Sequence, residues 1–120
     1  MIQVTKYITA DGVEYFHREV AKEHEDRMMY WLKEIKEKCV FMDSDCVPAE
    51  IIGINADYLY REIDRVFKAA VYVRIKNDIS TFALQCLGRM QKTDLIANGL
   101  KRKCGLYKLN SFGLWKECHD

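Results

Sequence analysis

Apolar and polar residues alternate in several short stretches of the chain, and this period of two predicts half-buried strands. Between the first two stretches, Asp11-Gly12 supplies the positive φ that a tight hairpin turn needs. Between the last two, the turn-rich residues 110–113 predict a second, closing hairpin. We expect strands over residues 2–8, 13–16, 69–75, 104–109 and 114–118.

Three longer segments carry apolar residues at three- and four-residue steps, which predicts amphipathic helices. The first segment is the longest and contains no glycine or proline. Asn55 is a suitable N-cap for the second helix, and Asn77 or Asp78 for the third. We expect helices over residues 17–38, 56–68 and 79–90, a short strand or the helix end at 39–42, and a helical turn at 93–98 closed by Gly99.

The predicted elements follow the order ββ-α-(β)-α-β-α-ββ, which indicates an α+β fold. We expect a small, mostly antiparallel sheet with about three helices covering one face. The 120 residues suffice for a single domain, residues 1–120, and are too few for two. No apolar run is long enough to span a membrane, and the first residues do not resemble a signal peptide. We therefore expect a soluble, cytoplasmic protein without a membrane partner.

The cysteines and histidines show no spacing that is typical of a metal site. Five cysteines are an odd number without a C-x-x-C pair, which favours reduced thiols over disulfides or a zinc ribbon. The acidic turn after residue 42 lacks the calcium-loop pattern, and the two histidines of the first helix lack the zincin spacing. We expect no metal and no other cofactor. The side chains weighed as ligands are Asp43, Asp45 and Glu50, and His17, His24, Cys39, Cys104, Cys118 and His119.

Charge is distributed unevenly along the chain, although the net charge is only +1. Residues 1–60 hold seven Lys/Arg and twelve Asp/Glu, a sum of −5, whereas residues 61–120 hold twelve and six, a sum of +6. A basic half attracts phosphates, and it can equally pair with the acidic half of the same chain or of a second copy. The opposed halves are therefore also compatible with a homodimer.

A basic run with interleaved aromatic residues lies in the second half of the chain. This combination suits nucleic acid or a free nucleotide, because cations follow phosphates while aromatic faces stack on bases. In the alternative interpretation, the aromatic residues lie in the sheet core and the basic run is a solvated loop. The candidate binding residues are Arg89, Lys92, Lys101, Arg102, Lys103, Tyr107 and Lys108.

The sequence contains no recognisable catalytic motif. It lacks a G-x-S-x-G elbow, a phosphate-binding G-K-[ST] loop and an H-E-x-x-H helix. A cysteine and a histidine that meet only in space would not be visible in a sequence, but nothing selects such a pair. We therefore expect that the protein is not an enzyme.

The two ends of the chain carry a further pattern. A strand, the Asp11-Gly12 turn and Tyr15-Phe16 precede a helix with Ala21-x-x-His24-Glu25, and Gly105-Leu106-Tyr107 pairs with Gly113-Leu114-Trp115 near the C-terminus. This pattern resembles a module of small accessory proteins of tailed bacteriophages. His17-Arg18 departs from it, since acidic or hydroxyl residues usually precede that helix. The match covers two terminal segments and none of the middle of the chain.

The resemblance implies a small protein made during infection that binds and redirects a host component. Inhibitors of bacterial immune systems are a prominent subset, and they occupy a surface rather than turn over a substrate. Our first hypothesis is therefore a phage-encoded, non-enzymatic inhibitor in the bacterial host cytoplasm. Its partner would be a host protein, most readily a component of an antiviral defence system. The alternative is a nucleic-acid or nucleotide binding protein that uses the basic C-terminal half.

Overall fold

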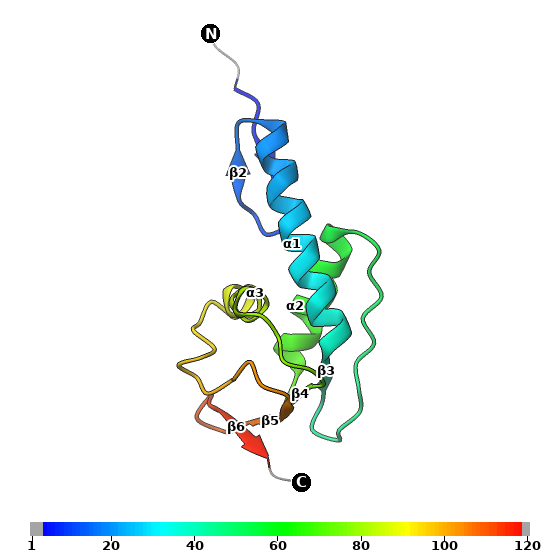
Figure 1. Cartoon of the computed structure of the whole chain (residues 1–120), viewed down its shortest axis with the longest axis vertical. Coiled ribbons are helices and arrows are strands. Elements are labelled where there is room, and N and C mark those ends of the chain that lie inside the picture. Colours follow the sequence, from blue (N-terminus) through cyan, green and yellow to red (C-terminus); the bar gives the residue numbers. More distant parts are fainter. Residues whose placement is uncertain (1–3, 119–120) are drawn as a thin grey trace.

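The computed structural model describes residues 4–118 and confirms the α+β fold (Figure 1). Three helices, a two-stranded sheet and a four-stranded sheet make up that range, and both sheets are antiparallel. None of these helices is both long and apolar enough to cross a membrane. The elements are β1 (Tyr7–Ile8), β2 (Glu14–Tyr15), α1 (Arg18–Lys38), β3 (Cys39–Met42), α2 (Ala56–Ala69), β4 (Tyr72–Ile75), α3 (Thr81–Gln91), β5 (Gly105–Leu109) and β6 (Trp115–Cys118).

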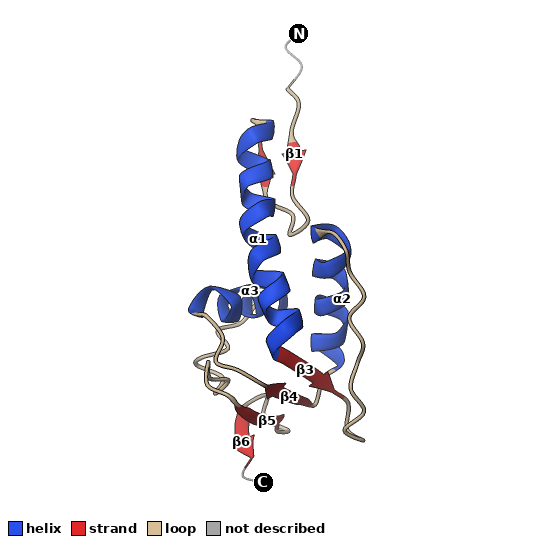
Figure 2. Ribbon diagram, turned by 45° about the vertical axis from the view of Figure 1, so that its right-hand side comes forward, coloured by secondary structure: helices blue, strands red, loops and turns tan. Residues whose placement is uncertain are grey.

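The larger sheet has the strand order β3-β4-β5-β6. Phe41, Val73 and Tyr107 stand opposite one another on its first three strands, and all three side chains are buried. Because side chains on a strand alternate between faces, these residues mark the face that is turned toward the core. Figure 2 shows this sheet at one end of the helices.

The core lies between this sheet and the helices. Phe67 of α2 connects the two layers, since its ring centroid lies 5.4 Å from that of Phe41 and 5.9 Å from that of Trp115. Burial of each large apolar side chain contributes about 1.5–3 kcal/mol to folding. The largest fully buried side chains of the three helices are Leu32, Ile35, Leu59, Ile63, Phe67, Leu84 and Leu87.

The N-terminal part of the chain extends away from this core (Figures 1 and 2). The protein measures 62 × 27 × 23 Å, and its radius of gyration is 15.8 Å, against about 14 Å for a compact chain of this length. The β1–β2 hairpin and the first turns of α1, residues 4–25, form this extension, which we call the projection. Within it only Thr9 and Ala21 are buried, so the projection adds little to the core.

The N-terminal hairpin is shorter than predicted, but its turn is confirmed. β1 and β2 pair Tyr7 with Tyr15 and Ile8 with Glu14, and Gly12 adopts a φ of +85°. β1 is exposed where we expected a half-buried strand, because the outer face of the hairpin packs against no other described element. Residues 2–3 of the predicted strand lie outside the described residues.

The third helix begins later than predicted, and its cap is a different residue. Ser80 caps α3 in place of Asn77 or Asp78, because its hydroxyl accepts a hydrogen bond from the N–H of Ala83 at 3.1 Å. The Asp78 carboxylate accepts instead from the N–H of Cys104, 2.8 Å away. Asp78 therefore binds the chain just before β5 rather than its own helix.

Most other boundaries lie close to the predicted ones, but the strand predicted over residues 69–75 begins only at Tyr72, because α2 continues through Ala69. Asn55 caps α2 as expected, accepting from the N–H of Tyr58 at 3.0 Å. Residues 39–42, for which we expected either a short strand or the end of the helix, form a strand. Residues 93–98 form turns rather than a helix, and Gly99 closes them with a left-handed φ of +93°.

Glu34 connects α1 to the start of α3. Its carboxylate accepts from the N–H and the hydroxyl of Ser80, both at 2.8 Å, and from Nζ of Lys38 at 3.3 Å. Burial alone would raise the pKa of Glu34, but the bonds from Ser80 and Lys38 hold it below the ordinary 4.5. The charged carboxylate therefore stabilises the fold above pH 4.5, and this contribution is lost as the pH falls through the folded-state pKa.

Replacing Glu34 by alanine is expected to lower the free energy of unfolding at neutral pH by about 2 kcal/mol, because charge-assisted hydrogen bonds are lost. The deficit relative to the wild type should shrink as the pH falls below 4.5. Urea denaturation over a pH series measures both effects. The control is Glu37→Ala, an exposed position of the same helix, which should change stability by less than about 0.5 kcal/mol. Equal losses in the two variants would contradict the role of Glu34.

Candidate functional site

The predicted basic residues lie in two groups at opposite ends of α3. Arg89 and Lys92 are at its C-terminal end. Near its start, the carbonyl of Arg102 accepts from the N–H of Ile79 at 2.9 Å, which holds residues 101–103 there. With a rise of 1.5 Å per residue, the eight residues of α3 from Thr81 to Arg89 alone separate the groups by about 12 Å. The structure therefore brings Lys101, Arg102 and Lys103 together but keeps Arg89 and Lys92 apart from them.

Several of these cations already have partners within the chain. Nε of Arg102 donates to the carbonyl of Ile79 at 3.0 Å, and Nζ of Lys101 lies 3.8 Å from a carboxylate oxygen of Glu117. Nζ of Lys108 lies 5.4 Å from the ring centroid of Tyr72, within the range of a cation–π contact. All three side chains remain exposed, so their charges still reach solvent.

Tyr107 corrects the aromatic part of the predicted binding site. Its side chain is fully buried in the sheet, and its hydroxyl donates to the carbonyl of Lys103 at 2.8 Å. Burial also raises the pKa of the phenol. A ring in this position cannot stack on a base, so Tyr107 is a core residue. Its hydrogen bond to the carbonyl of Lys103 helps to hold the basic loop in place. Periodicity alone could not decide whether Tyr107 is a stacking residue or a core residue, because a strand at the surface has one buried face and one exposed face.

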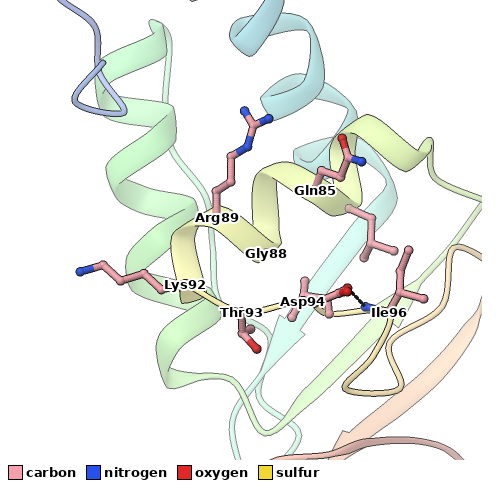
Figure 3. Close-up of a pocket in the computed structure, with 9 residues that line it drawn as sticks. Gln85, Gly88, Arg89, Lys92, Thr93, Asp94 and Ile96 are labelled. Carbon is pink, nitrogen blue, oxygen red and sulfur yellow. Dashed lines mark hydrogen bonds between the residues drawn. The ribbon is translucent and has the colours of Figure 1, made fainter. Parts of the chain in front are cut away.

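A hollow of about 550 Å³ lies along the C-terminal half of α3 and residues 93–96 (Figure 3). Two of its polar side chains are engaged: the Asp94 carboxylate accepts from the N–H of Ile96 at 3.1 Å, and the Thr93 hydroxyl from Asn98 Nδ2 at 2.6 Å. Arg89 rises toward α1, and Lys92 extends in another direction. Helix carbonyls at this end also carry partial negative charge. The Asp94 carboxylate and the helix carbonyls therefore oppose phosphate binding in this hollow, although Arg89 and Lys92 line it.

A cluster of polar side chains attaches the hairpin to α1. The hydroxyl of Tyr15 lies 3.0 Å from Nδ1 of His24, and Nε2 of His24 lies 2.8 and 2.9 Å from the two carboxylate oxygens of Asp11. Thr9 donates to the same carboxylate. Burial would raise the pKa of Asp11, but the bonds from Thr9 and His24 outweigh it and lower the pKa. Asp11, Tyr15 and His24, which we call the clamp, hold a hairpin that would be marginal alone.

Sequence reasoning weighed His24 as a metal ligand and missed its contacts with Asp11 and Tyr15. The partners Asp11 and Tyr15 lie on the turn and on β2, and no spacing rule connects such positions to a helix. The available signal was the pairing of an Asp-Gly turn with a lone histidine on the next helix, but that pairing by itself predicts no contact.

Replacing His24 by alanine is expected to release the hairpin from α1 while the rest of the fold stays intact, because the contacts of His24 with Tyr15 and with Asp11 are lost. The amides of Thr9, Gly12 and Val13, which close the turn, should exchange with solvent at least tenfold faster. Hydrogen exchange followed by NMR measures this. Tyr15→Phe, which removes one hydroxyl, should show a smaller acceleration. Unchanged exchange in His24→Ala would mean that the clamp does not hold the hairpin.

The outer face of the hairpin carries exposed apolar side chains. The register places Ile8 opposite Glu14, and its continuation places Phe16 opposite Lys6. The ion pair of Lys6 and Glu14, 3.3 Å apart, lies on this face. Ile8 is 64% exposed and Phe16 61%. We call Lys6, Ile8, Glu14 and Phe16 the hairpin surface: two apolar residues on one diagonal and two opposite charges on the other.

A second exposed apolar segment lies in the loop between β3 and α2. Ile51 packs against the core, whereas Ile52 and Ile54 are exposed. Gly53 allows this path, because a Cβ there would lie 2.8 Å from the Cα of Leu59. The exposed isoleucines of this loop are therefore not flanked by paired charges, unlike the apolar residues of the hairpin surface.

Cysteines and acidic residues form no metal site in the part of the chain that the structure describes. Between residues 4 and 118, no three His, Cys, Asp or Glu side chains are arranged to hold an ion. His119, one of the weighed ligands, lies outside that range. Cys39 and Cys86 are buried free thiols, and burial raises their pKa values to about 12 and about 11. Both thiols are therefore protonated at neutral pH.

Comparisons with protein-family models, with curated proteins and with solved structures give no match to this chain. The resemblance of the chain ends to phage accessory proteins stays a prediction.

Proposed function

We propose that this chain is a binding protein that attaches to another protein through the hairpin surface. The observation that carries the proposal is the exposure of Ile8 and Phe16 on a hairpin that the core does not need. Exposed apolar side chains cost solubility, and a contiguous group of them commonly marks an interface. A hairpin of two-residue strands is kept in place here by a dedicated clamp, which supports a role for its outer face.

The clamp also supports binding on energetic grounds. A loose hairpin would lose conformational entropy when a partner ordered it, whereas a fixed one has lost that entropy before binding. Thr9, Asp11, Tyr15 and His24 fix the turn and one face, so that Ile8 and Phe16 are presented in one arrangement. This is how a small surface can reach useful affinity.

The charge of the projection indicates what kind of surface its partner should have. Residues 4–25 contain three Lys/Arg and five Asp/Glu, a sum of −2. The complementary surface is an apolar patch with a basic rim. We further propose, on the resemblance of the chain ends alone, that the chain is a phage-encoded inhibitor and that the partner is a bacterial defence protein.

An affinity pull-down of the tagged chain from bacterial lysate, with and without nuclease, tests the proposal. We expect one protein in stoichiometric amount that survives nuclease, and mass spectrometry identifies it. Enrichment that disappears with nuclease would favour the nucleic-acid alternative at Lys101, Arg102 and Lys103. The absence of a stoichiometric protein would contradict the proposal.

Salt dependence separates the two functions independently. Phosphate binding weakens by orders of magnitude between low and moderate salt, whereas an apolar interface does not. A second copy of the chain is an alternative partner for the hairpin surface, and sedimentation measures directly whether such a dimer forms. A species of 14.1 kDa at all concentrations would exclude the homodimer.

A further inference from the structure

A second, smaller pocket lies where the hairpin turn meets all three helices. Its volume is about 250 Å³, which corresponds to about eight waters at liquid density. One wall is apolar and includes Met28 and Trp31 of α1. Asp11 of the turn, Tyr60 of α2 and Arg89 of α3 contribute polar groups. The pocket therefore suits a small molecule with an apolar body and one polar end.

Two of its polar groups have no partner within residues 4–118. The Arg89 guanidinium makes no hydrogen bond and no ion pair there, and the Tyr60 hydroxyl makes no hydrogen bond. Arg89 is exposed, lines both this pocket and the larger hollow, and rises from α3 toward α1 in Figure 3. Tyr60 is half-buried and lines the pocket together with Asp11 and Cys86. Burial, and after it the charge of Asp64, raises the pKa of its phenol. Both groups are donors without an acceptor.

The remaining polar groups are already engaged or neutral. Both carboxylate oxygens of Asp11 accept from His24, and one also accepts from Thr9. Both ring nitrogens of His24 are engaged as well. The Cys86 thiol is protonated at neutral pH, so it does not repel an anion. Arg89 is therefore the charged group of the pocket that is left to bind a ligand.

The chemistry of these groups defines the ligand. A guanidinium presents a planar fork of donors that matches the two oxygens of a carboxylate. The indole of Trp31 is stacked on Phe82, with 5.5 Å between ring centroids, so it forms a rigid wall for a flat apolar body. We propose that this pocket binds a small aromatic carboxylate, with its carboxylate on Arg89 and Tyr60 and its ring against Trp31 and Met28.

This inference goes beyond the proposed protein binding and needs no partner for its test. The free chain, labelled with ¹⁵N, is titrated with benzoate and with indole-3-carboxylate up to about 10 mM, and amide shifts are followed by NMR. We expect saturable shifts confined to the turn at Asp11, to the middle of α1, and to Tyr60 and Arg89. Benzamide, which has the same shape without the charge, should bind about tenfold more weakly.

Two variants of the same helix end make the test specific. Arg89→Gln should weaken benzoate binding by about tenfold, because the fork that holds the carboxylate is lost. Lys92→Gln removes the same charge from a side chain outside the pocket and should leave affinity within about twofold. Four results would overturn the proposal: no saturable shifts with either carboxylate, equal binding of benzamide, unchanged affinity in Arg89→Gln, or equal losses in both variants. None of them bears on the pull-down.

Discussion

A chain with Ile8→Lys and Phe16→Glu is expected to lose binding to its protein partner by about a hundredfold or more. Each wild-type side chain contributes about 1.5–3 kcal/mol when it is buried, and about 2.7 kcal/mol corresponds to roughly a hundredfold. The lysine introduced at position 8 would face Glu14, its partner in the register, so opposite charges meet across the strands. If the register continues one residue beyond β2, the glutamate introduced at position 16 would face Lys6. The net charge stays the same. The hairpin should therefore remain folded while its surface changes from apolar to polar.

The matched control makes the same two exchanges elsewhere. Ile54, 89% exposed, and Phe112, 86% exposed, lie on the loop before α2 and on the turn between β5 and β6. Ile54→Lys with Phe112→Glu should leave affinity within about twofold and stability within about 0.5 kcal/mol. Titration of each variant against the captured protein measures the affinities. Full binding by the hairpin variant, or an equal loss in the control, would show that the interface lies elsewhere.

Replacing Gly99 by alanine is expected to destabilise the protein by about 3 kcal/mol or more. A Cβ at this position would lie 2.2 Å from the carbonyl oxygen of Trp115, and the φ of +93° is unfavourable for any L side chain. The N–H of Trp115 donates to the neighbouring Asn98 at 2.6 Å, so the backbone there has no room to shift without losing that bond. Trp115 packs on Phe67, and disturbance of its strand therefore reaches the core.

The variant Gly113→Ala separates the cost of an unfavourable backbone conformation from the cost of a steric clash. Gly113 also has a positive φ, +78°, but a Cβ there would meet nothing within 4 Å. It should cost about 1 kcal/mol, the cost of the backbone conformation alone. Urea denaturation of both variants gives the comparison. Equal losses at the two positions would mean that the contact between Gly99 and Trp115 does not constrain the fold.

The fold could be predicted from local signals that the packed structure does not override. The stripe of the long first helix, the Asn55 cap and the alternation from Val73 to Ile75 all depend on short-range periodicity and capping, and the structure keeps them. The predicted start of α3 was wrong because Asp78 binds Cys104, a residue 26 positions later. Such a long-range bond cannot be derived from capping preferences.

The candidate site was harder to predict for the same reason. Tyr107 has the sequence context of a stacking aromatic, beside a basic run, but its strand turns it into the core. The bonds of His24 to Asp11 and Tyr15 depend on how the hairpin folds back on α1, which no periodicity describes. Arg89 was singled out by charge, but its place in a pocket depends on the approach of α1, α2 and α3.

The central claim is that a protein partner covers the outer face of the hairpin. Hydrogen–deuterium exchange of the chain, alone and with the captured protein, tests this most directly. We predict that residues 4–25 gain protection in the complex while residues 101–108 exchange as in the free chain. Protection confined to residues 101–108, with residues 4–25 unchanged, would contradict the claim and place the interface on the basic loop.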